Sequence, residues 1–441
     1  MAVASVPGRL PAADRRYESD LTGWLNPALP FYAIAGLPLY WLLGLGYFTF
    51  VIAAIPMALQ LLMIRPLRVP KGYGLWLMYV AWMLISALTL EPVVTRYLSF
   101  SIRASAYLAA TVIFLYIYNL PKKHLPTGRI LQVVGGLFVF CAVIGGYLGL
   151  LFGEYRFPSL LSLGLPRGLL ANSFVKNIVN PPLAQTQDFL GFPINRPAMP
   201  FSFTNDWGAT LVPATFMAIA YAGRMSRFRR LVPLIAIVSV VPMVISANRG
   251  MWVALILGAV YVTLRRASAG QLLLAIRLVV VLVFCSAVLL VSPLGEVIGA
   301  RSTSEHSIDA RGDIYSDVLE AIPGSPILGY GAPLANPNPN RPAIGTHGMF
   351  WTALFSQGIP GAIMHTAFWI GMTVRTGRNL RNQEQLWLHL AVASALPTMF
   401  FYDHLPAALP LMMIAAATIL RDRRHTDALR REALAAAPAT T

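Results

Sequence analysis

The sequence predicts an all-α fold: a polytopic integral membrane protein with about twelve transmembrane helices. Hydrophobic residues make up 56% of its 441 positions and charged residues only 12%, whereas about a quarter of the residues of a soluble domain are charged. Apolar runs of roughly 18 residues or more recur along the chain, and each can cross about 30 Å of hydrocarbon as a helix. These runs do not alternate between polar and apolar residues, which favours helices over a membrane β-barrel.

The apolar runs divide a single membrane domain, residues 28–420, into spans and connections. We expect spans at residues 28–44, 46–64, 72–90, 97–119, 128–152, 206–223, 229–247, 250–264, 271–292, 359–376, 385–402 and 405–420. The first two spans are separated by a short glycine-containing turn and are alternatively one bent hairpin. Two long polar connections, 153–205 and 293–358, are expected on the outer side, and the second forms a large external loop between helices 9 and 10.

Basic residues distinguish the two sides of this layout. The connections that alternate on one side, together with the tails 1–27 and 421–441, carry most of the 34 lysines and arginines, and such connections normally face the cytoplasm. Both termini are therefore expected to be cytoplasmic, and the tail 1–27 lacks the apolar core of a cleaved secretory signal. The net charge of +16 is explained as a topology signal, so the expected partner is the lipid bilayer and not nucleic acid.

No motif of a soluble enzyme class identifies the chemistry. The sequence contains no Walker loop, no GxGxxG after a strand, no HExxH and no CxxC. Cys141 and Cys285 lie inside apolar runs and are expected as buried side chains, not as a disulfide or a metal pair. Asp309, Asp313 and Asp317 follow one another at helical spacing, and a solvated helix face is favoured there over a metal site. We therefore expect no metal and no other cofactor.

Two short helices are expected within the external loop 293–358. Residues 309–322 place apolar side chains on one face of a helix and acidic side chains on another. Arg311 falls on the apolar stripe in the first turn, where its side chain can point past the end of the stripe. A second helix is expected to begin at His347, with Thr346 as its N-cap, and to end at Gly358.

Arginines are the distinctive charged residues of the outer side. Arg196 and Arg249 lie beside turns, and Arg311 lies in the loop helix. A guanidinium binds phosphate oxygens through two hydrogen bonds, so three arginines at one membrane surface indicate an anion site, although each alone could be an interfacial anchor. Arg103 lies about two turns into the fourth span, where a charge is costly. The sequence leaves two equal alternatives for Arg103: a functional role, or a side chain that extends to the membrane interface.

His347 is the strongest candidate for a catalytic base. The positive end of a helix dipole disfavours the imidazolium, so a neutral ring at a helix N-terminus is available near neutral pH. The alternative is a structural histidine. His306, in a polar loop, and His404, beside Asp403 at the outer end of a span, are weaker candidates.

Short segments between Arg196 and Gly361 form an ordered set. They are Arg196 followed by Asn205, Ser246-Ala247-Asn248-Arg249-Gly250, Arg311 leading an amphipathic helix, Pro326-Ile327-Leu328-Gly329-Tyr330-Gly331, His347-Gly348-Met349-Phe350 and Gln357-Gly358-Ile359-Pro360-Gly361. Their order and spacing resemble the O-antigen ligase and O-antigen polymerase superfamily of bacterial envelope glycosyltransferases. The layout of spans resembles that superfamily over the rest of the chain, whereas position 248 departs from it, because the family usually has serine there.

The resemblance implies metal-independent transfer of a glycan from a polyprenyl diphosphate carrier to an acceptor hydroxyl on the outer face of the bacterial cytoplasmic membrane. It implies that Arg196, Arg249 and Arg311 bind the diphosphate and that His347 acts as the base. Arg103 and Asn205 are additional candidates. The expected partners are a polyprenyl-diphosphate-linked glycan donor and a glycan or glycolipid acceptor, and the choice between ligase and polymerase stays open. A transporter or flippase of lipid-linked saccharides is the alternative.

Overall fold

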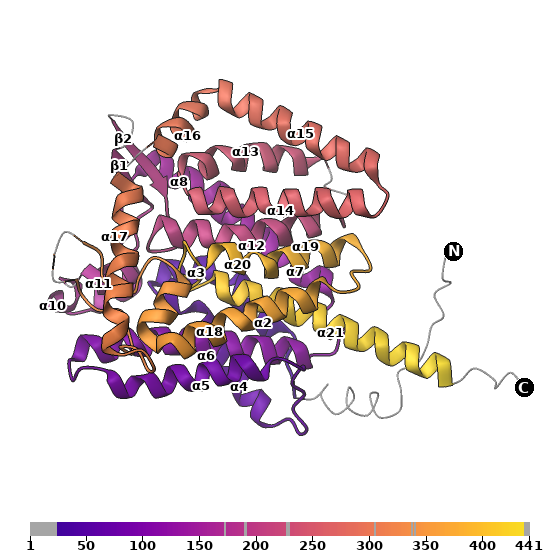
Figure 1. The fold of residues 1–441 in the computed structure, drawn as a ribbon, viewed down its shortest axis with the longest axis horizontal. Helices are drawn as coiled ribbons and strands as arrows, with labels where there is room; N and C mark the ends of the chain where they lie inside the picture. Colours follow the sequence, from indigo (N-terminus) through magenta and orange to yellow (C-terminus); the bar gives the residue numbers. More distant parts are fainter. Residues whose placement is uncertain are drawn as a thin grey trace, which may run out of the picture.

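The computed structural model is mostly α-helical and describes residues 24–171, 173–188, 192–225, 230–303, 306–336, 338 and 341–435. Most of the expected tail 1–27 and the last residues of the tail 421–441 lie outside the described residues, as do the side chains of Cys285, His306 and Arg311. The elements are α2 (Ala28–Ala35), α3 (Leu37–Leu43), η1 (Gly46–Phe48), α4 (Thr49–Leu62), α5 (Gly74–Ile85), η2 (Ser86–Thr89), α6 (Val94–Asn119), α7 (Thr127–Val139), η3 (Phe140–Gly145), α8 (Gly146–Phe152), α9 (Leu160–Gly164), α10 (Arg167–Leu170), α11 (Ser173–Val179), β1 (Ala184–Asp188), β2 (Pro193–Pro197), α12 (Thr204–Ala222), α13 (Leu231–Ile245), α14 (Arg249–Ser268), α15 (Leu272–Val291), α16 (Pro293–Thr303), α17 (His306–Ala321), η4 (Ile322–Gly324), α18 (Met349–Gly377), α19 (Gln383–Ala393), α20 (Ala395–Thr398) and α21 (Ala408–Ala435) (Figure 1).

The apolar runs of the sequence form helices in the structure. Within the described residues, four helical segments are long and apolar enough to cross a membrane by length and composition: Val94–Asn119, Thr127–Phe152, Arg249–Ser268 and Leu272–Val291. The second of these joins α7, the π-helical turn η3 and α8. Other expected spans contain helices that are shorter, broken or more polar, so the number twelve stays a prediction.

Helix α18 is kinked where the sequence predicts a helix end at Gly358. The short helix expected to end at this glycine and the span 359–376 are one element, with Gly358 at φ 69° and ψ −173°. A kink leaves backbone groups without their helical partners. The carbonyls of Phe355 and Ser356 accept hydrogen bonds from the amides of Tyr330 and Gly331 instead. The kink is therefore stabilised by the glycine-rich segment that crosses it.

Helix α6 packs against α4, α5 and α21. On α5, Trp76 donates a hydrogen bond to Thr111 of α6 at 2.8 Å. The rings of Trp76 and Tyr107 form a cluster with Phe368 of α18, and van der Waals packing of this kind stabilises contacts between membrane helices. The Tyr107 hydroxyl also lies 3.1 Å from the sulfur of Met349, so α6 is fixed beside the start of α18.

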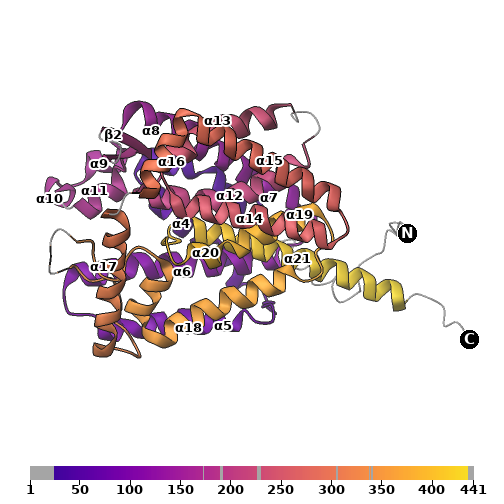
Figure 2. The same cartoon turned by 45° about the horizontal axis from the view of Figure 1, so that its top comes forward.

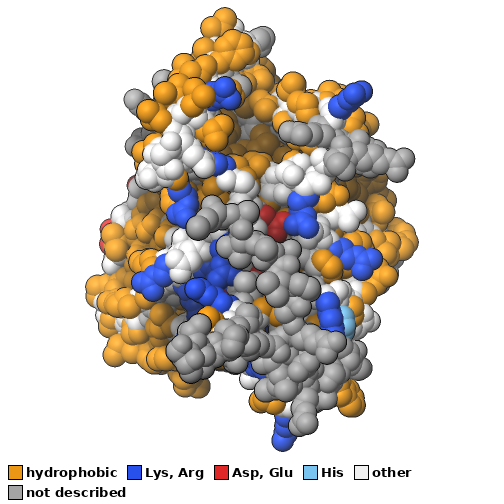
Figure 3. All heavy atoms as spheres, turned by 90° about the vertical axis from the view of Figure 1, so that its right-hand side faces the viewer, with side chains coloured by type: hydrophobic (Ala, Val, Ile, Leu, Met, Phe, Trp, Pro, Cys, Tyr) orange, Lys and Arg blue, Asp and Glu red, His pale blue; other side chains and the backbone are white. Residues whose placement is uncertain are grey.

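The polar connections gather at opposite ends of the bundle. In Figure 1 the hairpin β1–β2, α10, α11 and α17 lie at the left, and the C-terminal half of α21 projects at the right; the rotated view of Figure 2 keeps this separation. Ion pairs join distant segments near α21: Lys122 with Asp422, Arg224 with Glu384, and Arg381 with Asp427. Asp422 also pairs with its neighbour Arg421. Figure 3 faces this end and shows lysine and arginine side chains gathered on it.

Three features differ from the expectations. The connection 153–205 contains an antiparallel hairpin that pairs Ala184 with Pro197, although the sequence predicts an all-α fold. Helix α16 precedes α17 within the connection 293–358, where only two short helices, 309–322 and 347–358, are expected. Helix α21 continues through the expected tail to Ala435, because Arg421 and Asp422 are buried and continue the contacts of the helix beyond the apolar run.

Candidate active site

Arg196 is a buried arginine of strand β2. Its side chain is 5% exposed. Its Nε donates to the carbonyl of Ser246 at 2.6 Å, and its Nη atoms donate to Gln187 Oε1 at 2.5 Å and Asn248 Oδ1 at 3.4 Å. The guanidinium therefore fastens the hairpin to the turn between α13 and α14. This bonding to protein atoms is not evident from the sequence, which predicts a phosphate ligand.

Arg249 is the first residue of α14 and directly follows the N-cap residue Asn248. Two glycines allow this turn to pack closely. A Cβ on Gly208 of α12 would lie 2.7 Å from Asn248 Nδ2, and a Cβ on Gly250 would lie 2.9 Å from the Tyr402 ring. Real Cβ contacts are not this short, so both glycines are required for the present geometry. Helix α12 and Tyr402 thus determine the position of Arg249.

Tyr402 connects the turn that carries Arg249 to the turn that carries His347. Its hydroxyl accepts a hydrogen bond from the Met251 amide at 2.8 Å. Its carbonyl accepts one from the Met349 amide, also at 2.8 Å. Arg249 and His347 therefore each lie two residues before an amide held by the same tyrosine.

His347 does not open a helix, and that expectation is wrong. Helix α18 begins at Met349 with Gly348 as its N-cap, and His347 occupies the preceding turn with φ 65°. The hydroxyl of Thr346 lies 2.6 Å from the carbonyl of Ala343 and 2.8 Å from His347 Nδ1, so it is engaged locally and does not cap the helix. The half-buried imidazole still lies near the positive end of the α18 dipole.

Arg311 lies on helix α17, one turn before Tyr315. The hydroxyl of Tyr315 donates to the carbonyl of Phe400 at 3.0 Å. Its ring stacks on Trp351 of α18, with the ring centroids 4.4 Å apart. Helix α17 is therefore docked on the first turn of α18 and on the chain segment that leads into Tyr402.

Arg103 forms an ion pair with a carboxylate from the end of the chain. Its Nη2 lies 2.6 Å from Asp403 Oδ2, and the two side chains are 19% and 20% exposed. Asp403 directly follows Tyr402, and Tyr47 and Asp206 lie within electrostatic reach of the pair. Sequence reasoning missed Asp403. A charge inside a membrane helix usually has a partner, and that rule, applied to carboxylates at the outer ends of other spans, could have found it.

One comparison with known protein families bears on the resemblance. Residues 210–366 match the family model described as O-antigen ligase. This stretch of the chain is similar to the O-antigen ligase family. The match confirms the superfamily resemblance and covers Arg249, Arg311 and His347, whereas Arg196 and Arg103 lie outside it. No curated protein matches the chain in sequence.

Two further arginines hold the connection 293–358. Arg341 pairs with Asp313 at 2.9 Å and with Asp317 at 3.1 Å, which accounts for these carboxylates as a charged helix face. Arg96 of α6 is 7% exposed and donates to backbone carbonyls within residues 330–333. This connection is thus held by ion pairs between its own residues and by hydrogen bonds to α6.

The remaining candidate residues are partly or fully buried within the fold. Asn205 is half-buried in the first turn of α12. His404 is fully buried, and its Nε2 lies 2.9 Å from Thr398 Oγ1; burial lowers the pKa of this histidine to about 3, so the ring is neutral. Cys141 is a buried free cysteine, as expected.

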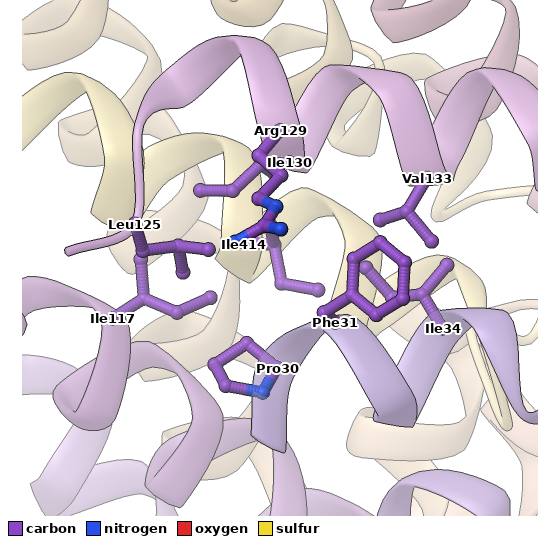
Figure 4. A pocket seen from close by; sticks show the side chains of 9 residues that line it. All are labelled: Pro30, Phe31, Ile34, Ile117, Leu125, Arg129, Ile130, Val133 and Ile414. Atoms are coloured by element: carbon purple, nitrogen blue, oxygen red, sulfur yellow. The ribbon is translucent and has the colours of Figure 1, made fainter. Parts of the chain in front are cut away.

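The small cavity shown in Figure 4 lies away from these residues. Arg129 and apolar side chains of α2, α6, α7 and α21 surround it. Its volume of about 10 Å³ holds one water at most. Ile117, on its wall, lies about 21 Å along α6 from Arg103 at 1.5 Å per residue. The cavity is therefore too small and too distant to form part of the candidate site.

Proposed function

We propose that this protein is a metal-independent membrane glycosyltransferase. It transfers a polyprenyl-diphosphate-linked glycan to an acceptor hydroxyl on the outer face of the bacterial cytoplasmic membrane. The observation that carries the proposal is the O-antigen ligase match over residues 210–366. The hydrogen bonds of Tyr402 support it, because they hold the turns of Arg249 and His347 against one segment.

The proposed topology has twelve spans within residues 28–420, with both tails in the cytoplasm. Two groups of contacts support it. Ion pairs join connections predicted to be cytoplasmic, such as the pair of Arg224 with Glu384, at the basic end seen in Figure 3. The turns of Arg249 and His347 meet Tyr402 among segments predicted to be external. The external loops proposed at about 153–205 and 293–358 then carry the chemistry.

In the proposed reaction, the arginines stabilise the leaving group and His347 activates the acceptor. The acceptor hydroxyl gives its proton to His347 while its oxygen attacks the anomeric carbon. The bond from that carbon to the diphosphate oxygen breaks, and the polyprenyl diphosphate leaves with the bonding electrons. Arg249 and Arg311 bind the diphosphate and stabilise the charge that develops on it. The proton then passes from His347 to water.

The other proposed residues support this arrangement. Arg196 holds the turn that presents Arg249 and adds positive charge behind it. Asn205 lies in the first turn of the adjacent helix α12. The ion pair of Arg103 with Asp403 holds the segment that contains Tyr402 against α6. Guanidinium groups stabilise anions in a partly buried site more strongly than in water, so a metal ion is not required by the proposal.

The hydrocarbon tail of the carrier fits a groove on α18. An apolar groove of about 370 Å³ runs along this helix between Phe350 and Ile370. Phe350 is three residues after His347, so the groove begins beside the proposed site. Beyond the kink at Gly358, the helix from Ile359 to Ile370 extends the groove by about 17 Å at 1.5 Å per residue. We propose that a prenyl chain lies there while its diphosphate reaches Arg249 and Arg311.

The decisive experiment measures glycan transfer by the purified protein in liposomes from a labelled polyprenyl-diphosphate donor. His347→Asn removes the imidazole and tolerates the left-handed turn, and we expect at least a hundredfold loss of rate. Arg249→Ala and Arg311→Ala should each lower the rate by a similar factor. Arg167→Ala, at an exposed site of α10, is the matched control and should transfer normally.

Two outcomes would overturn the proposal. Wild-type rates from His347→Asn would exclude the histidine as the base. Movement of the donor lipid across the membrane, with no new glycosidic bond, would instead support the transporter alternative.

A further inference from the structure

Thr346 and His347 form a hydrogen-bonded pair in the turn before α18. The Thr346 hydroxyl lies 2.6 Å from the carbonyl oxygen of Ala343 and 2.8 Å from His347 Nδ1. Both distances are those of well-formed hydrogen bonds. The hydroxyl therefore contacts two groups, the Ala343 carbonyl and the His347 imidazole. What the carbonyl can do determines whether the hydroxyl donates a hydrogen bond to the imidazole or accepts one from it.

Counting protons fixes the direction of both bonds. A carbonyl oxygen only accepts hydrogen bonds, so the single proton of the Thr346 hydroxyl points to Ala343. The hydroxyl oxygen then has only lone pairs left for the imidazole. His347 Nδ1 must carry a hydrogen and donate it to this oxygen. Because a neutral imidazole has one N–H, the lone pair that can accept a proton is on Nε2.

The backbone around this pair is held in place. The carbonyl that accepts from Thr346 belongs to Ala343, whose neighbour Ile344 exchanges two backbone hydrogen bonds with Leu334, at 2.7 and 3.0 Å. Gly345 has φ 78°, and a Cβ there would lie 2.5 Å from the Phe355 ring. The acceptor carbonyl is thus fixed by a bridge on one side and by close packing on the other.

We propose that Thr346 is a positioning residue that selects the Nδ1–H tautomer of His347, so that Nε2 is the nitrogen that takes the acceptor proton. This inference rests on the proposed glycosyltransferase function. When Nε2 accepts the proton of the acceptor hydroxyl, the attacking oxygen forms the new bond to the anomeric carbon and the diphosphate leaves with its electron pair. The resulting imidazolium has hydrogens on both nitrogens. Nδ1 keeps its bond to Thr346 throughout, so the turn does not rearrange.

The tautomer can be measured without any substrate. Protein labelled with ¹⁵N-histidine, reconstituted in lipid, gives separate NMR signals for protonated and unprotonated ring nitrogens, and the His347→Asn spectrum identifies the signals of position 347. In the unmodified protein we expect a protonated Nδ1 and an unprotonated Nε2. Thr346→Val keeps the side-chain shape but removes the hydroxyl, and should yield a mixture of tautomers. Thr346→Ser keeps the hydroxyl and should restore the single form.

Transfer rates give the second readout. Thr346→Val should lower kcat roughly tenfold or more with little change in KM, because a correctly placed base contributes about 10²–10⁴ to the rate. Thr346→Ser should recover most of the loss, whereas a merely structural defect would not separate kcat from KM or follow the tautomer signal.

The outcomes separate this inference from the proposed function. A protonated Nε2 in the unmodified protein, or an unchanged tautomer in Thr346→Val, would overturn the role of Thr346 whatever the activity. The expected tautomer together with wild-type transfer by His347→Asn would instead overturn the proposed function and leave the hydrogen-bond assignment intact.

Discussion

Replacing Tyr402 by phenylalanine should uncouple the turn that carries Arg249 from the turn that carries His347. The hydroxyl of Tyr402 is the hydrogen-bond acceptor for the Met251 amide at 2.8 Å. That amide belongs to the first turn of α14, where backbone N–H groups have no acceptor within the helix. Both residues are buried, at 1% and 0% exposure. The Tyr402→Phe variant therefore leaves a buried donor without its acceptor.

The expected size of the effect follows from this geometry. An unsatisfied buried donor costs about 1–3 kcal/mol, so the free energy of unfolding should fall by that amount. The turn that presents Arg249 can relieve the cost by moving away from the phenylalanine ring. A displacement of about 1 Å in a reacting group can reduce a rate by roughly a hundredfold. We therefore expect transfer to fall by roughly 10- to 100-fold in the folded variant.

A second tyrosine provides the control for the lost hydrogen bond. The hydroxyl of Tyr147 donates to the carbonyl of Val238 at 3.1 Å, between α8 and α13. Tyr147→Phe should lower the thermal unfolding temperature of the protein in detergent without affecting glycan transfer. If Tyr402→Phe and Tyr147→Phe transfer glycan at equal rates, Tyr402 does not couple Arg249 to the site.

Further substitutions test the same arrangement. Gly250→Ala would place a Cβ 2.9 Å from the Tyr402 ring and should lower the transfer rate, whereas Gly371→Ala, with no atom within 4 Å, should not. Arg96→Lys loses the forked donors to the carbonyls of Ala332 and Tyr330 and should lower the unfolding free energy by roughly 2–3 kcal/mol, measured by thermal unfolding. Burial lowers the pKa of His404 to about 3, below its unfolded value of about 6.5, so the unfolded chain binds the extra proton first. His404 should therefore reduce the stability by about 1.4 kcal/mol per pH unit as the pH falls from about 6 towards 4, and His404→Asn should flatten this slope in unfolding measured against pH.

The long apolar helices were predictable from the sequence because each is encoded locally by an apolar run. The run around Arg103, for example, gives the long helix α6, and the positions of glycine and proline indicate where other runs are broken. The sequence could not show that Gly358 is a kink inside α18 and not a helix end. The kink persists because the amides of Tyr330 and Gly331 bind the carbonyls it exposes, and those residues lie more than twenty positions earlier in the chain.

The hairpin β1–β2 escaped prediction for a related reason. Its strands are polar, and they lack the alternation of apolar residues that identifies a half-buried strand. The structure supplies stabilising groups from elsewhere. Arg196 joins the hairpin to the turn at Ser246, and the side chain of Asn195 donates to the carbonyl of Leu150. Long-range hydrogen bonds of this kind leave no local pattern in the sequence.

The candidate residues could be identified from the sequence, but their positions relative to one another could not. Arginine and histidine in the polar connections of an apolar chain are conspicuous, and the O-antigen ligase match covers Arg249, Arg311 and His347. Placing His347 inside a helix was wrong because Thr346 was assumed to bond forwards to the helix amides. Its hydroxyl bonds backwards to Ala343, an alternative that threonine offers wherever a turn precedes a helix.

The segment that ends in Tyr402 explains why the assembly of the site is hidden from the sequence. Phe400 contributes its carbonyl to Tyr315 of α17, and Tyr402 contributes its carbonyl to Met349 of α18. Every residue has a carbonyl, so no side-chain pattern marks these two contacts. The side chains that do mark the segment, the Tyr402 hydroxyl and the Asp403 carboxylate, reach α14 and α6. Four helices from distant parts of the chain thus contact one short segment. Two of these contacts use backbone carbonyls, which a sequence cannot distinguish from any others.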